Sequence, residues 1–147
     1  IYFFCFIFFF FSNLLQLKII LFSILIGCIS SDIGGYFFGK ILKGPKLTKI
    51  SPKKTITGAF GSLIFTIIFM CGSIFYFTKD FSYLIIILAI LISISCQVGD
   101  LFFSFLKRKA KIKDTGNFLP GHGGILDRLD GILFGLPVGL IFLTLLF

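Results

Sequence analysis

Ser104 to Asp130 reads S-F-L-K-R-K-A-K-I-K-D-T-G-N-F-L-P-G-H-G-G-I-L-D-R-L-D, a polar island between the apolar runs Phe81–Phe103 and Leu129–Phe147. The island holds six of the 14 Lys and Arg residues, three of the six acids and the only His. About 20 mostly apolar residues in a helix cross the ~30 Å hydrocarbon core of a membrane. The two flanking runs therefore predict spanning helices, with a polar site where they meet.

The composition extends this prediction to the whole chain. Of the 147 residues, 57% are hydrophobic and only 14% are charged, whereas about 25% of the residues of an average soluble domain are charged. The fold class that we predict is all-α: a polytopic transmembrane helix bundle forming a single integral-membrane domain over residues 1–147. Because the chain begins at Ile1 inside an apolar run, we expect an N-terminal part to precede it.

Five apolar segments are candidate spans, the first of them as the end of a longer span. These are residues 1–11, Leu14–Ser31, Thr57–Phe77, Phe81–Phe103 and Leu129–Phe147. The short connection Thr78–Asp80 predicts a helical hairpin. The other two connections, Asp32–Ile56 and Ser104–Arg128, are long, basic and rich in Gly and Pro. An even number of spans separates them, so they are predicted to lie on one face of the membrane and to form the polar site together.

The side of the membrane follows from charge. Lys and Arg accumulate in the cytoplasmic loops of membrane proteins, and all but two of the 14 basic residues fall in these two loops. We therefore expect a multi-pass protein of the cell membrane (the inner or plasma membrane), with both loops of the polar site in the cytoplasm. The same distribution explains the net charge of +8 without nucleic acid, because no aromatic-interleaved basic module of the RNA-binding type is present.

The cysteines and the acids differ in what their positions predict. The four cysteines lie within apolar runs without a CxxC pair, which is typical of small buried side chains. Five of the six acids fall at or beside predicted cytoplasmic helix ends: Asp32, Asp100, Asp114, Asp127 and Asp130. Carboxylates that converge from different elements suit a divalent cation. Pairing with a neighbouring Lys accounts well for Asp114 but poorly for Asp100, which follows an apolar stretch.

A helical stripe would start at Asp100 if the helix continues past Phe103. Residues at offsets of 4, 7 or 8, and 11 share one face of a helix. On this stripe lie Asp100, Ser104, Lys107 or Arg108, and Lys111. A carboxylate and a hydroxyl followed by cations are the mixture that a metal-bound polyphosphate needs. An amphipathic helix on anionic lipid would explain the cations but not the Asp and the Ser.

A glycine-rich loop precedes the last span. Pro120–Gly124 contains Gly123 and Gly124, which permit close approach of the backbone to an anion. Asp127 and Asp130 follow on one helical face, with Arg128 between them. For His122 we favour a structural or phosphate-contact role, with general base and metal ligand as alternatives.

The first loop repeats this chemistry in the pentapeptide S-P-K-K-T. Ser51, Lys53, Lys54 and Thr55 place hydroxyls and cations beside the start of a predicted helix, where anions bind favourably. The spacing is not that of a P-loop. A basic cytoplasmic loop without a substrate role is the alternative.

The region of residues 100–130 resembles the signature of the phosphatidate cytidylyltransferase (CDP-diacylglycerol synthase) family. The matching positions are Ser104, Lys107, Arg108, Lys113, Asp114, Gly116, Leu119, Pro120, His122, Gly123, Gly124, Asp127, Arg128 and Asp130. The pattern D-x-G-x-Y-x-x-G-K from Asp32 and the S-P-K-K-T segment also resemble the family, in the expected order. One departure follows that segment, where the family commonly has an acid and this chain has Ile56 and Thr57 before Gly58.

The resemblance implies transfer of a cytidylyl group from CTP to phosphatidic acid in the lipid bilayer, with Mg²⁺ as cofactor and a second, monovalent cation as an option. It implies metal binding by Asp100 and Asp127, to which Asp32 and Asp130 are added as candidates. Catalytic roles are assigned to Asp100, Asp127, Ser104, Lys107 and Arg108. Substrate contacts are assigned to Ser51, Lys53, Lys54, Thr55, Lys113, His122, Gly123, Gly124 and Arg128.

Two other functions remain open at this point. An ion or lipid transporter subunit would carry polar residues to mid-depth in its spans, whereas here they gather at one face. A related membrane lipid or polyprenol kinase would keep the phosphate chemistry and change the nucleotide. Oligomeric state stays open as well, with a homodimer among the options.

Overall fold

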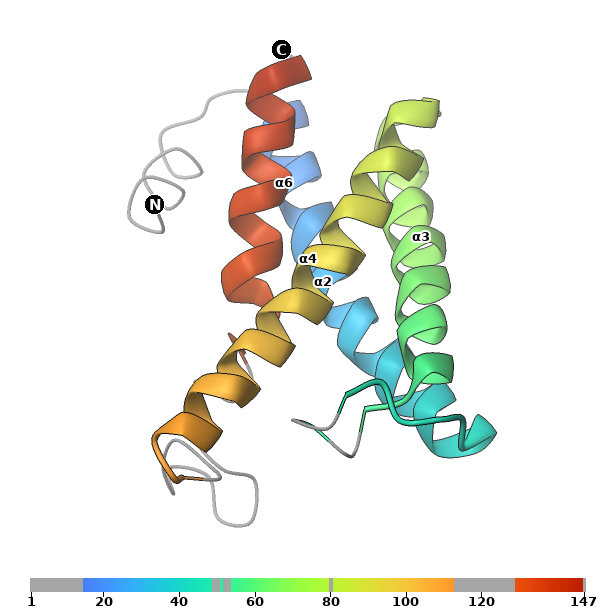
Figure 1. Cartoon of the computed structure of the whole chain (residues 1–147). Helices are drawn as coiled ribbons and strands as arrows, with labels where there is room; N and C mark the ends of the chain where they lie inside the picture. The colour runs from blue at the N-terminus through green and yellow to red at the C-terminus, as the bar shows by residue number, and fades with distance from the viewer. Residues whose placement is uncertain (1–14, 49–50, 52–53, 80, 113–128, 147) are drawn as a thin grey trace, which may run out of the picture.

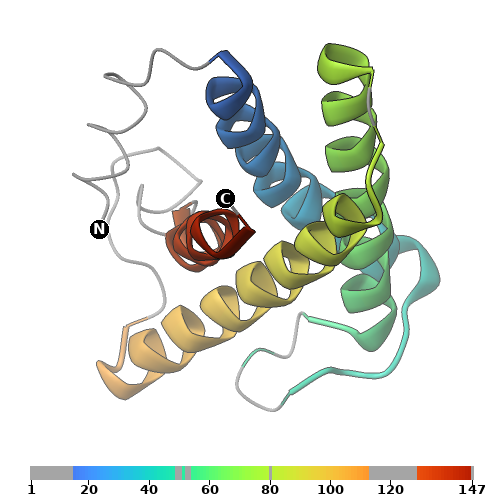
Figure 2. The same cartoon turned by 90° about the horizontal axis from the view of Figure 1, so that it is seen from above.

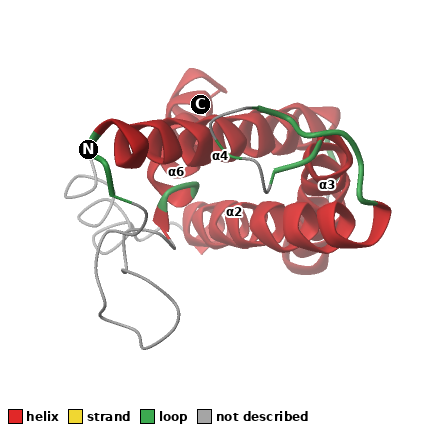
Figure 3. Cartoon of the chain, turned by 60° about the horizontal axis from the view of Figure 1, so that its bottom comes forward, coloured by secondary structure: helices red, strands yellow, loops and turns green. Residues whose placement is uncertain are grey.

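The structure is a computed structural model that describes residues 15–48, 51, 54–79, 81–112 and 129–146. Within this part of the chain, four helices follow one another, and Figure 3 shows helices and loops with no strand. They are α2 (Leu15–Leu42), α3 (Ile56–Thr78), α4 (Tyr83–Lys109) and α6 (Ile132–Leu146). The predicted all-α class is confirmed.

Three of these helices are long and apolar enough to cross a membrane, over Lys18–Leu42, Ile56–Thr78 and Tyr83–Lys109. The predicted spans Thr57–Phe77 and Phe81–Phe103 are therefore confirmed. The fifth predicted span corresponds to α6, which is shorter than the other three. The predicted segment of residues 1–11 lies outside the described residues.

The prediction that the helix beginning at Leu14 ends at Ser31 is wrong, because α2 continues to Leu42. Asp32 is therefore an interior helical residue and not the first residue of a loop. Gly34 and Gly35 lie within this helix and serve its packing against α3. A Cβ atom at Gly34 would lie 2.6 Å from the Gly61 carbonyl oxygen of α3. The glycines thus let α2 and α3 approach closely.

Local capping explains where α3 and α4 begin and how they are joined. Thr55 Oγ1 accepts a hydrogen bond from Gly58 N at the start of α3, and Ser82 Oγ accepts one from Leu84 N at the start of α4. Lys79 ends α3 in the left-handed conformation, with φ of 59°. N-caps of this kind satisfy amides that have no partner within the helix. The predicted hairpin between these helices is confirmed.

The helices cross rather than run parallel. Figure 1 shows α4 running diagonally across α2, and Figure 2 shows the crossing from above, with α6 beside it. The buried centre is formed by Ile24, Cys28, Met70, Ile74, Leu88, Ala89, Ile92 and Cys96. Cys28 and Cys96 are free thiols in this centre, as predicted for small buried side chains.

The ends of the helices gather at two opposite ends of the bundle. The loop between α2 and α3 lies at the lower end in Figure 1, as does the C-terminal end of α4, whereas the α3–α4 turn lies at the upper end. This arrangement agrees with the predicted placement of the two basic segments on one face. Which side of the membrane that face occupies stays a prediction.

Candidate active site at one end of the bundle

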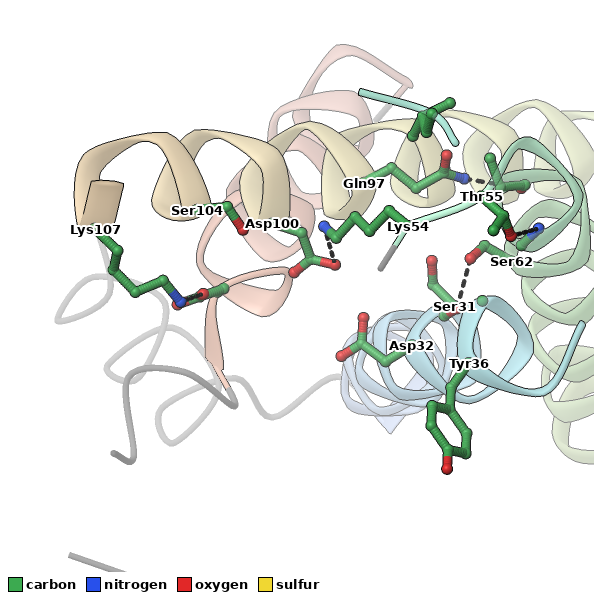
Figure 4. A pocket seen from close by; sticks show the side chains of 15 residues that line it. Ser31, Asp32, Tyr36, Lys54, Thr55, Ser62, Gln97, Asp100, Ser104 and Lys107 are labelled. Carbon is green, nitrogen blue, oxygen red and sulfur yellow. Dashed lines mark hydrogen bonds and ion pairs between the residues drawn. The ribbon is translucent and has the colours of Figure 1, made fainter. Parts of the chain in front are cut away.

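A cavity of about 380 Å³ lies between the α2–α3 loop and the C-terminal half of α4. Side chains from α2, α3, α4, the α2–α3 loop and the residues before α6 contribute to it (Figure 4). Its lining comprises Ser31, Asp32, Gly35, Tyr36, Leu47, Lys54, Thr55, Gly58, Ala59, Ser62, Gln97, Asp100, Ser104, Lys107 and Asp130. The predicted meeting of residues from both basic regions with the membrane acids is thus observed.

The α2–α3 loop is folded so that Lys54 returns to the cavity. Two backbone hydrogen bonds hold the loop as a short antiparallel pairing: Leu47 N donates to Lys54 O at 2.8 Å, and Ile56 N donates to Pro45 O at 2.9 Å. Gly44 N donates to Thr57 Oγ1 at 3.3 Å. Thr57, which follows the S-P-K-K-T segment where the resembled family commonly has an acid, therefore anchors the far side of this loop.

Gly131 lies where two carboxylates meet. A Cβ atom at this position would lie 3.2 Å from Asp100 Oδ1 and 3.3 Å from Asp32 Oδ1. The two oxygens come from α4 and α2, so helices far apart in the sequence direct negative charge toward one point. The lack of a side chain at Gly131 leaves this space open. Oxygen atoms of two carboxyl groups that face one point are ligands that a divalent cation can share.

Lys54 forms an ion pair with Asp100, with Nζ 3.1 Å from Oδ2. The Lys54 side chain is 29% exposed and that of Asp100 is 28% exposed. Lys54 Nζ itself is buried and has no hydrogen-bond partner among the described residues, so its exposed part is the aliphatic stem. An ammonium with unused donors can bind a phosphate in addition to its carboxylate.

Lys107 forms the second ion pair, with Asp130, and this pair is more enclosed. Lys107 Nζ donates to Asp130 Oδ2 at 2.9 Å, and the two side chains are 14% and 8% exposed. The contact joins the C-terminal part of α4 to the residue two before α6. It thereby fixes the position of Gly131 beside the carboxylates.

The helical stripe predicted from the sequence is present in part. The helix continues to Lys109, and Asp100, Ser104 and Lys107 all line the cavity. Arg108 is exposed and lies outside the lining. Lys111 lies beyond the end of α4 with φ of 56°, so the predicted stripe ends before it. The turn after Lys109 changes the direction of the chain, which the periodicity alone does not reveal.

Comparison of the sequence with known protein families identifies the family of this chain. The model of the family described as "Cytidylyltransferase family" matches residues 1–146 of the chain. The chain belongs to the cytidylyltransferase family. The family resemblance noted in the sequence is thus confirmed.

Proteins similar to this chain include phosphatidate cytidylyltransferases of several bacteria. The protein of that name from Helicobacter pylori is 40% identical over 120 residues, covering 76% of this chain and 42% of the relative. The Bacillus subtilis protein is 44% identical over 123 residues (80% and 44%), and the Rickettsia bellii protein is 45% identical over 118 residues (74% and 51%). The chain therefore spans about half or less of the length of these relatives.

Several predicted site residues of this cytidylyltransferase chain lie outside the described residues. These are Lys53, Lys113, His122, Gly123, Gly124, Asp127 and Arg128. Ser51 is described but does not line the cavity. Its carbonyl accepts a hydrogen bond from Lys54 N at 3.1 Å, so it supports the loop that carries Lys54.

The described residues fit a metal ion that is shared with a substrate. Among them, no group of three or more His, Cys, Asp or Glu side chains could hold a metal ion alone. Mg²⁺ is commonly bound by one or two carboxylates together with substrate phosphates and water. Asp32 and Asp100 provide two carboxylates that face one point, which is the hard-oxygen donor set that this ion prefers.

Some cavity residues were not found by the sequence reasoning. Gln97 lies one turn before Asp100 on α4, and Ser62 and Leu47 come from α3 and the loop. An amide within an apolar run was a usable signal for Gln97. Ser62 gave no signal, because serine is common in membrane helices, where it bonds to the backbone. In the structure, its Oγ donates to Ser31 O at 2.8 Å across the α2–α3 contact.

Proposed function

We propose that this chain carries the catalytic site of a phosphatidate cytidylyltransferase. The reaction would transfer the cytidylyl group of CTP to phosphatidic acid, forming CDP-diacylglycerol and pyrophosphate. The observation that carries the proposal is the cavity in which the carboxylates of Asp32 and Asp100 face one point beside Lys54 and Lys107. The names of the bacterial relatives support the choice of substrates.

In this reaction, an oxygen of the lipid phosphate attacks the α-phosphorus of CTP. One P–O bond forms, the bond to the β-phosphate bridging oxygen breaks, and pyrophosphate leaves with the electron pair. The nucleophile is already an anion, so no proton has to be removed from it. Because no general base is needed, carboxylates, lysines and a hydroxyl are sufficient for this chemistry.

The residues of the chain would divide the work by charge. Lys54 and Lys107 would bind phosphate oxygens, and the Ser104 hydroxyl would donate a hydrogen bond to one of them. Asp32 and Asp100, together with Asp127 and Asp130 as predicted from the sequence, would hold Mg²⁺. The ion, when bound, would neutralise phosphate charge and orient the reacting groups.

The surface beside the cavity suits a lipid substrate. Ile33, which follows Asp32 on α2, is 54% exposed, and Phe102, near Asp100 on α4, is 45% exposed. Apolar side chains at the surface of a spanning helix face the lipid tails. Phosphatidic acid could therefore present its phosphate to the cavity while its acyl chains remain in the membrane.

An assay of membranes containing the chain tests this proposal. Labelled CTP and phosphatidic acid are supplied with and without Mg²⁺, and ATP and other lipid acceptors are supplied in parallel. We expect Mg²⁺-dependent CDP-diacylglycerol in the wild type and its loss in Asp100→Asn and Asp127→Asn, with both variants still inserted in the membrane. Transfer from ATP instead of CTP would favour a lipid kinase, and full activity of both variants would refute the metal assignment.

A further inference from the structure

The cavity has two chemically different ends. Figure 4 shows Lys107, Ser104, Asp100 and Gln97 in this order along α4. The charged residues of the lining are Asp32, Lys54, Asp100, Lys107 and Asp130. Gln97 bonds to the uncharged Ala59, and the stem of Lys54 passes beside it while the Lys54 ammonium is directed to Asp100. A nucleoside triphosphate has the same polarity, with a charged chain at one end and a neutral base at the other.

The orientation of the Gln97 amide is fixed by its surroundings. Nε2 donates to the Ala59 carbonyl oxygen at 3.1 Å and to Ser93 Oγ at 3.3 Å. A carbonyl oxygen only accepts hydrogen bonds, so the amide nitrogen and not its oxygen must face Ala59. Figure 4 shows this nitrogen on its dashed bond and the oxygen turned away from it.

The amide oxygen is left as an acceptor at the uncharged end. Within the described part of the chain, Gln97 Oε1 accepts no hydrogen bond, although the side chain is half-buried and lines the cavity. The neighbouring hydroxyls are engaged: Thr55 Oγ1 accepts from Gly58 N, and Ser62 Oγ donates to Ser31 O. A purely structural role in joining α4 to α3 would account for the hydrogen bond from the amide nitrogen of Gln97 to Ala59, but it would leave its amide oxygen without a role.

We propose that Gln97 Oε1 accepts a hydrogen bond from the exocyclic amino group of the nucleotide base, so that the uncharged end of the cavity seats the cytosine of CTP. This assignment rests on the proposed function in taking CTP as the nucleotide. Cytosine presents a 4-amino donor, whereas uracil presents a 4-oxo acceptor at the same position. Gln97 would thus be a specificity-determining residue that rejects UTP.

The register of α4 agrees with this assignment. Gln97 and Asp100 are three residues apart and lie on one helical face, separated by about 4.5 Å along the axis at ~1.5 Å per residue. The base would then lie next to the carboxylates that face the α-phosphate, with Lys107 about 15 Å from Gln97 by the same rise. The base and the phosphates would occupy successive turns of one helix.

Binding of nucleotide analogues to the purified chain in detergent tests the proposal. The informative analogue is the pyrimidin-2-one ribonucleoside triphosphate, which has hydrogen in place of the 4-amino group of CTP. Loss of one hydrogen bond to a half-buried group weakens binding by about 10- to 100-fold. We expect the wild type to bind CTP tighter than the analogue and UTP by this factor.

The variant Gln97→Met separates base recognition from a structural role. We expect it to bind CTP and the deamino analogue equally, at the affinity that the wild type shows for the analogue. Ser95→Ala is the matched control, since Ser95 Oγ donates to Leu91 O of its own helix and lies outside the lining; it should keep the wild-type preference. Weakening of both ligands by the same factor in Gln97→Met would overturn the proposal.

Two further outcomes keep the test decisive. Should Gln97→Met fail to fold, N4,N4-dimethyl-CTP, which has no donor hydrogen at this position, replaces the variant, and equal binding of CTP and this analogue to the wild type overturns the proposal. Transfer to phosphatidic acid is measured in parallel. Amino-dependent binding without any transfer would refute the proposed function and leave the base site standing.

Discussion

The two lysine–aspartate pairs of the cavity are expected to differ in what they contribute to stability. We compare Lys107→Met with Lys54→Met, which remove the same charge and keep the aliphatic stem. In the first case the remaining carboxylate, Asp130, is 8% exposed, and in the second the remaining carboxylate, Asp100, is 28% exposed. Water can replace the lost ammonium far better at Asp100.

The magnitudes follow from burial. Removal of one partner from a buried ion pair typically destabilises a protein by ~3–5 kcal/mol, whereas exposed pairs contribute ~0.2–1 kcal/mol. We therefore expect a loss of about 3 kcal/mol in the free energy of unfolding for Lys107→Met. For Lys54→Met we expect a smaller loss of about 1–2 kcal/mol, because the remaining Asp100 carboxylate is partly exposed.

Equilibrium unfolding in mixed micelles with increasing SDS, followed by far-UV circular dichroism, measures both values. Lys40→Met is the matched control. It also removes one Lys charge, but Lys40 lies in the last turn of α2 and outside the cavity lining. Adding Asp130→Asn to Lys107→Met should cost less than the sum of the two single changes. Equal losses for Lys107→Met and Lys54→Met, or full additivity of the double variant, would refute the reasoning.

Three further predictions concern the loop, the helix contact and the nucleotide. Lys54→Met should raise the KM for CTP at least about tenfold through loss of a phosphate contact, while Lys40→Met leaves KM unchanged; a normal KM for Lys54→Met would exclude that contact. Gly58→Ala places a Cβ atom 2.7 Å from Gly35 O and should destabilise by ~1–3 kcal/mol in SDS unfolding, whereas Gly72→Ala meets nothing within 4 Å and should not. Thr57→Val removes the acceptor for Gly44 N and should weaken CTP binding by calorimetry; unchanged affinity would mean that the loop holds without it.

Periodicity was sufficient to predict the α4 face of the site. Asp100, Ser104 and Lys107 differ by 4 and 3 residues, and any helix through them must place them on one side. The hairpin after α3 was equally accessible, because a three-residue connection between two apolar runs leaves little freedom. These features depend on local geometry, which a single sequence contains.

The extension of α2 to Leu42 could not be predicted in the same way. Gly34 and Gly35 have the composition of a turn, and only the partner helix shows why they are glycines. Their small size is needed against α3, where a side chain would collide with Gly61 O or Ser62 Oγ. Glycine in membrane helices commonly marks such contacts, but the sequence does not say which glycines break a helix and which pack it.

The ion pair between Lys54 and Asp100 could not be predicted from the sequence either, because it depends on how the loop before α3 folds back. Lys54 reaches Asp100 only because Pro45, Leu47 and Thr57 tie that loop to the start of α3. The sequence indicated that Lys54 and Asp100 belong to one site, but it treated one as a phosphate ligand and the other as a metal ligand. In the structure they bind each other.

That pairing bears on how the proposed site would fill. Before nucleotide binds, Lys54 neutralises part of the charge that Asp32 and Asp100 direct toward Gly131. A metal–triphosphate complex brings a cation for the carboxylates and phosphates for the ammonium, so both partners of the 3.1 Å contact would gain a new counter-charge in one event. Neither the ion alone nor the triphosphate alone satisfies both groups. Under the proposed function, the arrangement would therefore favour entry of the nucleotide together with its metal ion. The ion pair with Lys54 would make the Asp100 carboxylate tolerable in the apolar bundle while no metal ion is bound.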